Sequence, residues 1–393
     1  MITFTHLRSL KRRYVAALFA ACVSFAGFGL GNEAVAGPEV RLVPAGPIEP
    51  VFLWKRSRCS DDDIPDTPLR AVRLAPTSVL AFSTHFENRR FFGTDLNSIS
   101  RDCTVVFSGK GSPNPEDYSD RVWISSTWSE DGRTIFALGH DEYQAHRHPG
   151  RCRFSKYIEC WYNAIVLLRS DDAGRRFSRV GERPVASIPI RQDVDQGHNR
   201  GYFEPSNIIK RGDYYFALIR TGPEGAQKAG TCLFRADDLR QPESWRFYDG
   251  EGFSPNFDPY RDEVSEAKPC APLQGLKGVV GSVAYVPRYG AYIAVSNFGS
   301  GSQSTSGFYY SVSTDLVHWT DGRLFLSLAT PWSTVCGQDR FAYPSLVDVD
   351  SPSRNFDVVG SESYLYFVRQ HFDGCQGTLQ RDLVRIKLRL EFK

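Results

Sequence analysis

The sequence predicts an all-β fold, and three observations support this prediction. Five short apolar segments of similar composition recur along the chain, with starts 56 to 80 positions apart. Each follows a glycine or polar turn and an earlier extended segment, as in a β-hairpin. No stretch has the length and period of a long amphipathic helix. Repeats of this length indicate a five-bladed β-propeller of four-stranded antiparallel blades. The five segments are 79–82, 135–138, 215–218, 292–295 and 365–368.

Residues 1–36 have the pattern of a secretory signal peptide. Basic residues precede an apolar run at 14–30, and Ala34-Val35-Ala36 forms a small-x-small cleavage site. A membrane anchor is the weaker alternative because the run is short. We therefore expect a secreted protein, extracellular or periplasmic, with no membrane association after cleavage. Residues 37–58 are expected to form an extended arm, and residues 59–393 one propeller domain that is monomeric.

Composition narrows the class of partner. The chain has 47 Lys and Arg against 45 Asp and Glu, and this balance leaves no basic footprint for nucleic acid. Aromatic residues make up 13% of the chain, which suits packed sheets and also suits a cleft in which rings stack on sugars. A carbohydrate is therefore the expected partner.

The cysteine count supports secretion. Of nine cysteines, Cys22 lies in the predicted signal peptide, and the other eight form an even set, as in disulfide-bonded secreted proteins. Their spacing lacks the Cys-x-x-Cys pairs of a zinc site. Eight cysteines allow 105 pairings, but the repeat suggests local ones. These are Cys59–Cys103, Cys152–Cys160, Cys232–Cys270 and Cys336–Cys375.

The first half of the domain shows strand pairs and marked turns. Residues 67–82 form the first expected pair. Segments 121–128 and 133–138 form the second, joined through Asp131-Gly132, a strong hairpin signal. A strand at 162–169 runs into 170–177, which fits the Asp-box pattern S-x-D-x-G-x-x-aromatic. Its Asp accepts backbone N–H groups and its Gly supplies a positive φ, so its role is structural.

The second half repeats these features around one conspicuous carboxylate. Segment 201–220 reads as two strands and a turn, with Glu204 just before Pro205 at the expected strand start. Segment 281–295 forms the fourth pair. Segment 342–347 opens the fifth and echoes 203–208. Residues 382–392 alternate polar and apolar, as expected for a closing strand.

Carboxylates head three consecutive blades. In a propeller the innermost strands converge on a central channel, so residues that head them lie close together. Cleavage of a glycosidic bond needs one protonated acid and one ionised base or nucleophile, and a third charge can raise the acid's pKa. An Asp before a strand is also a common turn residue, whereas Glu204 lies within an apolar run. The heading residues are Asp66, Asp120, Glu204, Ser282 and Tyr343.

These motifs resemble those of family 43 glycoside hydrolases and their furanosidase-like relatives. The resemblance rests on the edge motif at 313–319, the Tyr-Pro-Ser-Leu opening of the last blade and the Asp, Asp, Glu series. It implies single displacement with inversion, in which Asp66 is the base, Asp120 tunes the pKa and Glu204 is the acid. Asp141 and Glu142 are alternatives to Asp120. The chain departs from the family where Thr67 follows Asp66 and where Pro-Ser follows Glu204.

Further polar residues near the expected channel are candidates for substrate binding. They are His85, His140, Glu142, Arg220 and Tyr343. No cofactor is expected to be required. A structural calcium ion is compatible with the sequence, because Ca²⁺ prefers carboxylate and carbonyl oxygens. The sequence does not identify its ligands.

Two other functions compete with a glycosidase. The first is a non-catalytic propeller that binds glycan or protein. The second is a sialidase-like enzyme, prompted by the Asp-box. It would need three arginines around a carboxylate, for which Arg70, Arg220 and Arg369 are the candidates, together with a Tyr–Glu pair.

Overall fold

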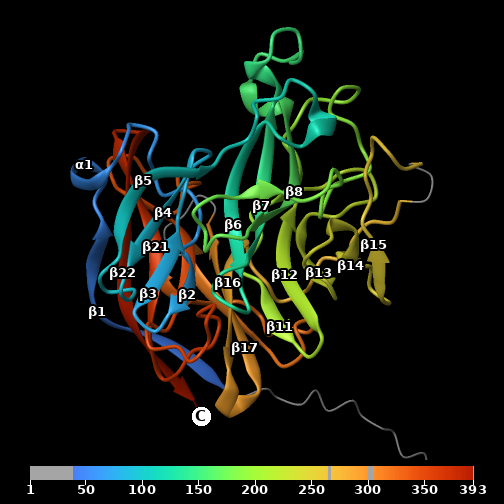
Figure 1. Cartoon of the computed structure of the whole chain (residues 1–393). Coiled ribbons are helices and arrows are strands. Elements are labelled where there is room, and N and C mark those ends of the chain that lie inside the picture. The colour runs from blue at the N-terminus through green and yellow to red at the C-terminus, as the bar shows by residue number, and fades with distance from the viewer. Residues whose placement is uncertain (1–38, 264–266, 300–304, 393) are drawn as a thin grey trace, which may run out of the picture. The chain divides into compact units, whose positions relative to one another are not determined.

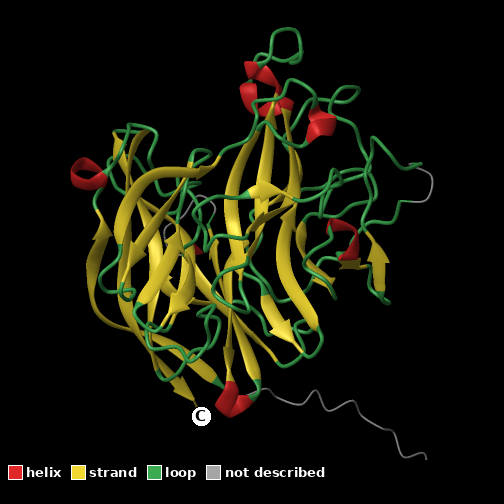
Figure 2. Ribbon diagram, in the orientation of Figure 1, coloured by secondary structure: helices red, strands yellow, loops and turns green. Residues whose placement is uncertain are grey.

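Strands make up nearly all of the regular structure of the computed structural model, which describes residues 39–263, 267–299 and 305–392. The helices are short: α1 (Trp54–Ser57) has four residues, and the rest are single 3-10 turns (Figure 2). The all-β prediction is confirmed. In the described part of the chain no helix is long and apolar enough to cross a membrane. The predicted signal peptide lies outside the described residues.

Three sheets have four strands each. The first has the order β2 (Arg70–Ala75), β3 (Ser78–Phe82), β4 (Asn88–Gly93), β5 (Ser100–Phe107). The second has the order β16 (Val279–Val286), β17 (Ala291–Phe298), β18 (Gly307–Ser313), β19 (Arg323–Ser327). The third has the order β1 (Val40–Phe52), β22 (Gln376–Phe392), β21 (Glu362–Asp373), β20 (Arg340–Val347).

The third sheet joins the two ends of the described chain. β1 pairs antiparallel with β22 along most of its length (Figure 1). Strand β1 lies within residues 37–58, for which an extended arm was predicted. The segment is extended, but it is the edge strand of a sheet. The sequence concealed this strand because it contains Pro44, Pro47 and Pro50, and prolines are tolerated in a strand at an edge.

A ten-stranded sheet contains the rest. Its main path is β6 (Arg121–Trp128), β7 (Ile135–Gln144), β8 (Trp161–Ser170), β10 (Arg200–Phe203), β12 (Tyr214–Thr221), β13 (Gly230–Ala236), β14 (Arg246–Tyr248), β15 (Phe253–Pro255). Two further strands, β9 (Ser178–Arg179) and β11 (Ile209–Arg211), pair with β8 and β12. It differs from the predicted separate four-stranded units because a parallel pairing of Arg200 with Tyr162 and Gly201 with Asn163 joins β8 to β10.

Side-chain hydrogen bonds connect five groups of strands in a closed cycle: β2–β5, β6–β9, β10–β15, β16–β19 and the sheet of β1 and β20–β22. Asn88 on β4 donates to the Val122 carbonyl on β6 at 2.7 Å, and Ser126 on β6 donates to the carbonyl of Ser206, after β10. The side chain of Asn207 donates to the Val283 carbonyl on β16 at 2.9 Å. The Leu346 N–H on β20 donates to the Ser282 hydroxyl at 2.8 Å, and Ser345 donates to the Leu69 carbonyl, just before β2, at 2.8 Å.

The hydrophobic core lies between the faces of these neighbouring groups. One cluster unites Leu80 of β3 with Ile124 of β6 and Phe234 of β13, and another packs Leu218 of β12 against Ala294 of β17. Two more clusters pack the β20–β22 strands against β16–β18 and against β2–β4. Apolar packing therefore follows the same cycle as the hydrogen bonds, and it brings the starts of the inner strands together.

The predicted turns and bridges are present. In the Asp-box, Asp172 accepts the N–H groups of Arg175 and Arg176, while Gly174 has φ +75° and Phe177 is buried. The disulfides join Cys59 to Cys103, Cys152 to Cys160, Cys232 to Cys270 and Cys336 to Cys375, which are the four pairs suggested by the repeat.

Candidate active site

A small cavity lies at the starts of the inner strands and contains most of the predicted site residues. Its volume is about 30 Å³, roughly the room that one or two water molecules need. It is lined by Asp66, Thr67, Pro68, Trp123, Ser125, His140, Glu142, Glu204 and Tyr343. The structure thus brings Asp66 and Glu204 together, although they lie far apart in the sequence.

Local backbone geometry directs Glu204 and Tyr343. Both precede a proline, and both have a positive φ, +46° and +59°. The β20–β21 register shifts between Ala342 and Ser345, and β10 ends at Phe203, just before Glu204. Such irregularities re-aim side chains and are frequent near functional sites. The first of the two strands predicted within 201–220 is therefore interrupted at Glu204.

Glu204 has the electrostatics of a protonated acid. Its carboxyl is desolvated although the residue keeps part of its surface accessible, and this burial raises its pKa to about 7. The negative charge of Glu142 raises the pKa further, whereas the positive charge of Arg220 lowers it. Near neutral pH the side chain can therefore hold a proton and release it.

Glu142 is a second acid in the same cavity. Burial raises its pKa to about 7, opposed by a hydrogen bond from Gln144 at 2.8 Å and by the charge of Arg121. The charge of Asp120 acts in the same direction as burial. Glu142 therefore interacts electrostatically with Glu204 in the cavity and with Asp120 outside it.

Asp66 is held by two donors from the last strands of the chain. The Tyr343 hydroxyl donates to Asp66 Oδ1 at 3.0 Å, and Arg381 forms an ion pair with the same oxygen. His85 Nε2 lies 4.0 Å from the other carboxylate oxygen. Burial lowers the pKa of His85 to about 4, so near neutral pH the imidazole is uncharged and the ion pair of Asp66 is with Arg381.

His140 of β7 and Trp123 of β6 are paired in the sheet register, and both line the cavity. His140 Nε2 lies 3.0 Å from Asn163 Oδ1, and burial lowers the pKa of His140 to about 4. Trp123 is 5% exposed, and its indole N–H has no hydrogen-bond partner among the described residues. A buried donor of this kind favours a ligand acceptor in the cavity.

Asp120 does not line the cavity. Its carboxylate accepts the Gln144 N–H at 2.8 Å, and its Oδ2 lies 3.0 Å from His148 Nε2. Asp141, one alternative for its role, is buried and accepts the Asp120 N–H at 3.0 Å. Neighbouring residues on β7 point to opposite faces, so of the two alternatives Glu142 reaches the cavity and Asp141 does not.

The arginines of the sialidase-like alternative do not converge. Arg220 acts on Glu204, but Arg369 pairs with Asp382 at 2.8 Å. Arg70 is buried and donates to backbone carbonyls, including those of Ser125 and Gly281. Two of the three guanidinium groups are therefore committed within the protein, and the sialidase-like alternative is not supported.

The described residues contain no group of three or more His, Cys, Asp or Glu side chains arranged to hold a metal ion. The calcium expectation therefore has no assigned ligands. The Arg70 guanidinium donates to the carbonyls of Leu69, Ser125, Pro205 and Gly281.

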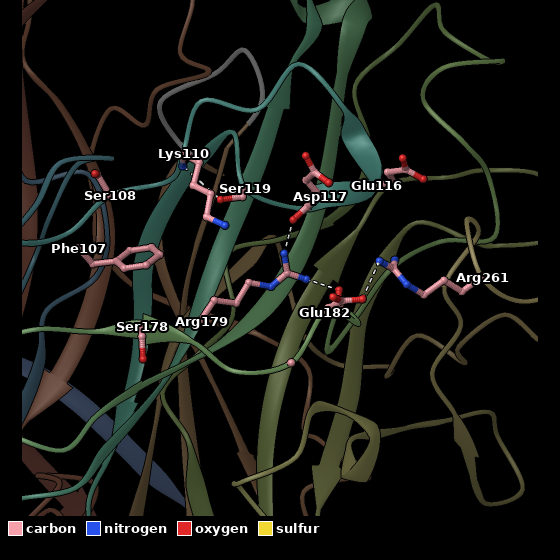
Figure 3. A pocket seen from close by; sticks show the side chains of 11 residues that line it. Phe107, Ser108, Lys110, Glu116, Asp117, Ser119, Ser178, Arg179, Glu182 and Arg261 are labelled. Carbon is pink, nitrogen blue, oxygen red and sulfur yellow. Dashed lines mark hydrogen bonds and ion pairs between the residues drawn. The ribbon is translucent and has the colours of Figure 1, made fainter.

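A larger cavity of about 540 Å³ lies elsewhere and has different properties (Figure 3). Its acids Glu116, Asp117 and Glu182 are exposed, and Glu182 and Arg261 form an ion pair at 3.7 Å. Arg179 donates to the carbonyls of Asp117 and Glu182. None of the predicted catalytic residues lines it, so we place the candidate site in the small cavity.

Trp123 and Arg381 are among the site residues that were not singled out from the sequence. The position of Trp123 could have been predicted, because it lies near the start of the predicted strand 121–128, which follows Asp120. Nothing in the sequence pointed to Arg381, because it is 315 positions from its partner Asp66.

No family model matches the chain, and no curated protein sequence matches it. Solved glycoside hydrolases are similar in structure. A family 117 enzyme of Zobellia galactanivorans has 11% identity and a TM-score of 0.48, covering 90% of this chain and 91% of that one. An endo-arabinase of Bacteroides thetaiotaomicron has 10% identity and a TM-score of 0.46, and the match covers 86% of this chain and 96% of that one. An α-L-arabinanase of Cellvibrio cellulosa, complexed with arabinohexaose, has 12% identity and a TM-score of 0.45, and the match covers 83% of this chain and 91% of that one.

Proposed function

We propose that this chain is a secreted, inverting glycoside hydrolase that acts on poly- or oligosaccharides and is built as a five-bladed β-propeller of four-stranded blades. The cycle of hydrogen bonds and core contacts through five strand groups supports this architecture. The four disulfides support secretion. We expect a monomer with no cofactor requirement.

One observation carries the proposal: Glu204, whose pKa is raised to about 7, lines the same cavity as the ion-paired carboxylate Asp66. Glu204 donates its proton to the glycosidic oxygen as the bond to the anomeric carbon breaks. Asp66 takes a proton from the water that attacks this carbon from the opposite face. The product has inverted configuration, and the two carboxyl groups should be about 6.5–9.5 Å apart. Glu142 tunes the acid, the role first predicted for Asp120.

The size of the cavity favours a second candidate, a propeller that binds glycan or protein without turnover. A volume of about 30 Å³ holds water but no sugar ring. Hydrolysis therefore requires side chains such as Arg381 to move when substrate binds. A binding protein would leave its acids paired as they are.

Hydrolysis of aryl glycosides and of arabinose- and xylose-containing polysaccharides separates the two candidates. We expect turnover by the wild type and a loss of about 10²- to 10⁴-fold in Glu204→Gln, the range for removal of a general acid. Aryl glycosides with an activated leaving group should lose less, because they need no protonation. The matched control is Glu116→Gln, an exposed glutamate of the larger cavity. Sugar binding without turnover by the wild type would establish the second candidate. Proton NMR of the first product gives the stereochemistry.

A further inference from the structure

The hairpin between β7 and β8, residues 145–160, has no role in the proposed chemistry. It contains the 3-10 helices η2 (Ala145–Arg147) and η3 (Tyr157–Cys160) and projects beyond the ends of its strands (Figures 1 and 2). The Cys152–Cys160 disulfide closes it. It is therefore a constrained projection at the end of β7 that carries Glu142.

The hairpin continues the face of the sheet that bears the cavity residues. Glu142 is paired with Asn163, and Gln144 with Trp161, in the β7–β8 register. Directly paired residues share a face, and so do residues two apart along a strand. Trp161 thus lies on the face of His140 and Glu142. Because Trp161 is paired with Gln144, two residues beyond Glu142, it lies about 7 Å nearer the hairpin than Glu142. This spacing is comparable with the length of one sugar unit.

Three rings form a wall at this point, which we call the aromatic wall: His146, Tyr157 and Trp161. The centroids of Tyr157 and Trp161 are 5.4 Å apart, and those of His146 and Tyr157 are also 5.4 Å apart. The Trp161 indole N–H donates to His146 Nδ1 at 3.2 Å. Tyr157 is 56% exposed. The rings are thus ordered by one another but remain open to solvent.

The hairpin that carries the aromatic wall is rich in positive charge. The hairpin carries the exposed cations Arg147, Arg151, Arg153 and Lys156. Its one acid is Glu159. Across the described residues, none of these four cations forms an ion pair. Arg121 of β6 is paired with Glu142 of β7 in the sheet register, so the two side chains share a face. Burial lowers the pKa of Arg121, and the charge of Arg147 lowers it further. The charges of Asp120, Asp62 and Glu142 raise the pKa of Arg121, so this guanidinium lies among charges of both signs. An anion next to Arg121 would offset the repulsion from Arg147.

We propose that the aromatic wall, with Arg121 and Arg147, binds an acidic sugar of the substrate chain, next to the sugar held at the cavity. The apolar face of the sugar stacks on Tyr157 and Trp161, and its carboxylate or sulfate pairs with the two guanidinium groups. The inference rests on the proposed function and names its substrate class, an anionic polysaccharide. Because the rings and the disulfide order the hairpin in advance, little conformational entropy is lost on binding.

The test is calorimetric titration of the Glu204→Gln variant, which should hold oligosaccharides without cleaving them. The probes are trigalacturonate, a sulfated galacto-oligosaccharide and neutral xylotriose. We expect at least one anionic probe to bind more tightly than xylotriose, with an affinity that falls as salt rises. Adding Arg147→Gln should weaken the anionic probe about three- to tenfold and leave xylotriose unchanged. Adding Tyr157→Ala should weaken both by a similar factor.

The controls place the same changes at the other ends of strands. Arg175→Gln lies in the turn after β8, opposite Trp161, and Tyr214→Ala lies at the exposed start of β12. Neither should alter binding. Equal affinity for neutral and anionic probes, or no effect of Arg147→Gln, would overturn the inference, as would a failure to bind any probe. Turnover by the wild type is measured separately, so hydrolysis with no anionic preference sinks this inference alone, and binding without hydrolysis sinks the proposed function alone.

Discussion

At the scale of single residues, the candidate site is defined by charges that oppose each other around Glu204. Burial is the first cause of its raised pKa, Glu142 adds to it, and Arg220 subtracts from it. A general acid works best when its pKa lies near the working pH. The environment of Glu204 meets this condition through burial, adjusted by two neighbours of opposite charge that can each be removed separately.

Removing these neighbours should move the pH profile in opposite directions. If Glu204 must be protonated, kcat/KM falls above a pKa of about 7. Glu142→Gln removes a negative charge that raises this pKa, so the alkaline limb should move to lower pH. Arg220→Gln removes a positive charge that lowers it, so the limb should move to higher pH. The measurement is kcat/KM against pH with an oligosaccharide, whose leaving group needs protonation by the general acid, and Glu116→Gln should not move the limb. Shifts of the same sign would contradict this account of the acid.

The same carboxyl makes folding stability depend on pH. Its folded pKa of about 7 lies above the ordinary value of 4.5. Between these values the folded chain binds a proton that the unfolded chain has released, so stability is fully present below pH 4.5 and is lost as pH rises through 7. From pH 5 to pH 8 the wild type should lose on the order of 1–3 kcal/mol more than Glu204→Gln. Denaturant unfolding at both values measures this difference, and parallel losses would contradict it.

At the scale of elements, local sequence patterns predicted strands and turns well but not their irregularities. The Asp-box and the Asp131-Gly132 turn were readable because their hydrogen bonds lie within a few residues. The likeness of 203–208 and 342–347 was also visible. Its consequence was not: a positive φ before each proline aims Glu204 and Tyr343 at the cavity. A local irregularity of the backbone changes the face of the sheet that a side chain reaches. The alternation of polar and apolar residues in the sequence does not reveal such an irregularity.

The position of Asp120 shows the same limit. The sequence placed it correctly just before an inner strand, β6 (Arg121–Trp128), but its carboxylate satisfies the Gln144 N–H instead of facing the cavity. Glu142, an alternative drawn from the sequence, lies there. Contacts such as Asp66 with Arg381 depend on packing across the whole chain, so no local pattern predicts them. The count of five blades stays a prediction.

At the scale of the whole molecule, one buried arginine holds several strand groups together. Arg70 Nε donates to the Ser125 carbonyl at 2.6 Å, and Nη2 donates to those of Pro205 at 3.2 Å and Gly281 at 2.7 Å. The strand registers shift beside Ser125 and at Gly281, and Pro205 follows Glu204. The guanidinium therefore satisfies carbonyls at the irregular points of three inner strands, including the one that directs the candidate acid.

Replacing Arg70 should weaken both the fold and the position of Glu204. Burial lowers the pKa of Arg70 to about 9, which shows how costly its desolvated charge is, but its removal leaves buried carbonyls without donors at about 1–3 kcal/mol each. We expect Arg70→Met to lose about 3–5 kcal/mol in denaturant unfolding, the range for breaking a buried charged network. The control Arg175→Met, at an exposed site, should stay within about 0.5 kcal/mol.

Arg70→Lys distinguishes positioning from stability. It keeps the charge but replaces the planar fork with one ammonium, which cannot reach all the carbonyls in the same geometry. In the folded variant, the Pro205 carbonyl should shift and change the surroundings of Glu204, so the alkaline limb of kcat/KM should move even where unfolding shows the protein to be native. If Arg70→Lys keeps the wild-type limb and Arg70→Met keeps the wild-type stability, the strand groups are held together by their hydrogen-bond cycle and apolar core without the central guanidinium.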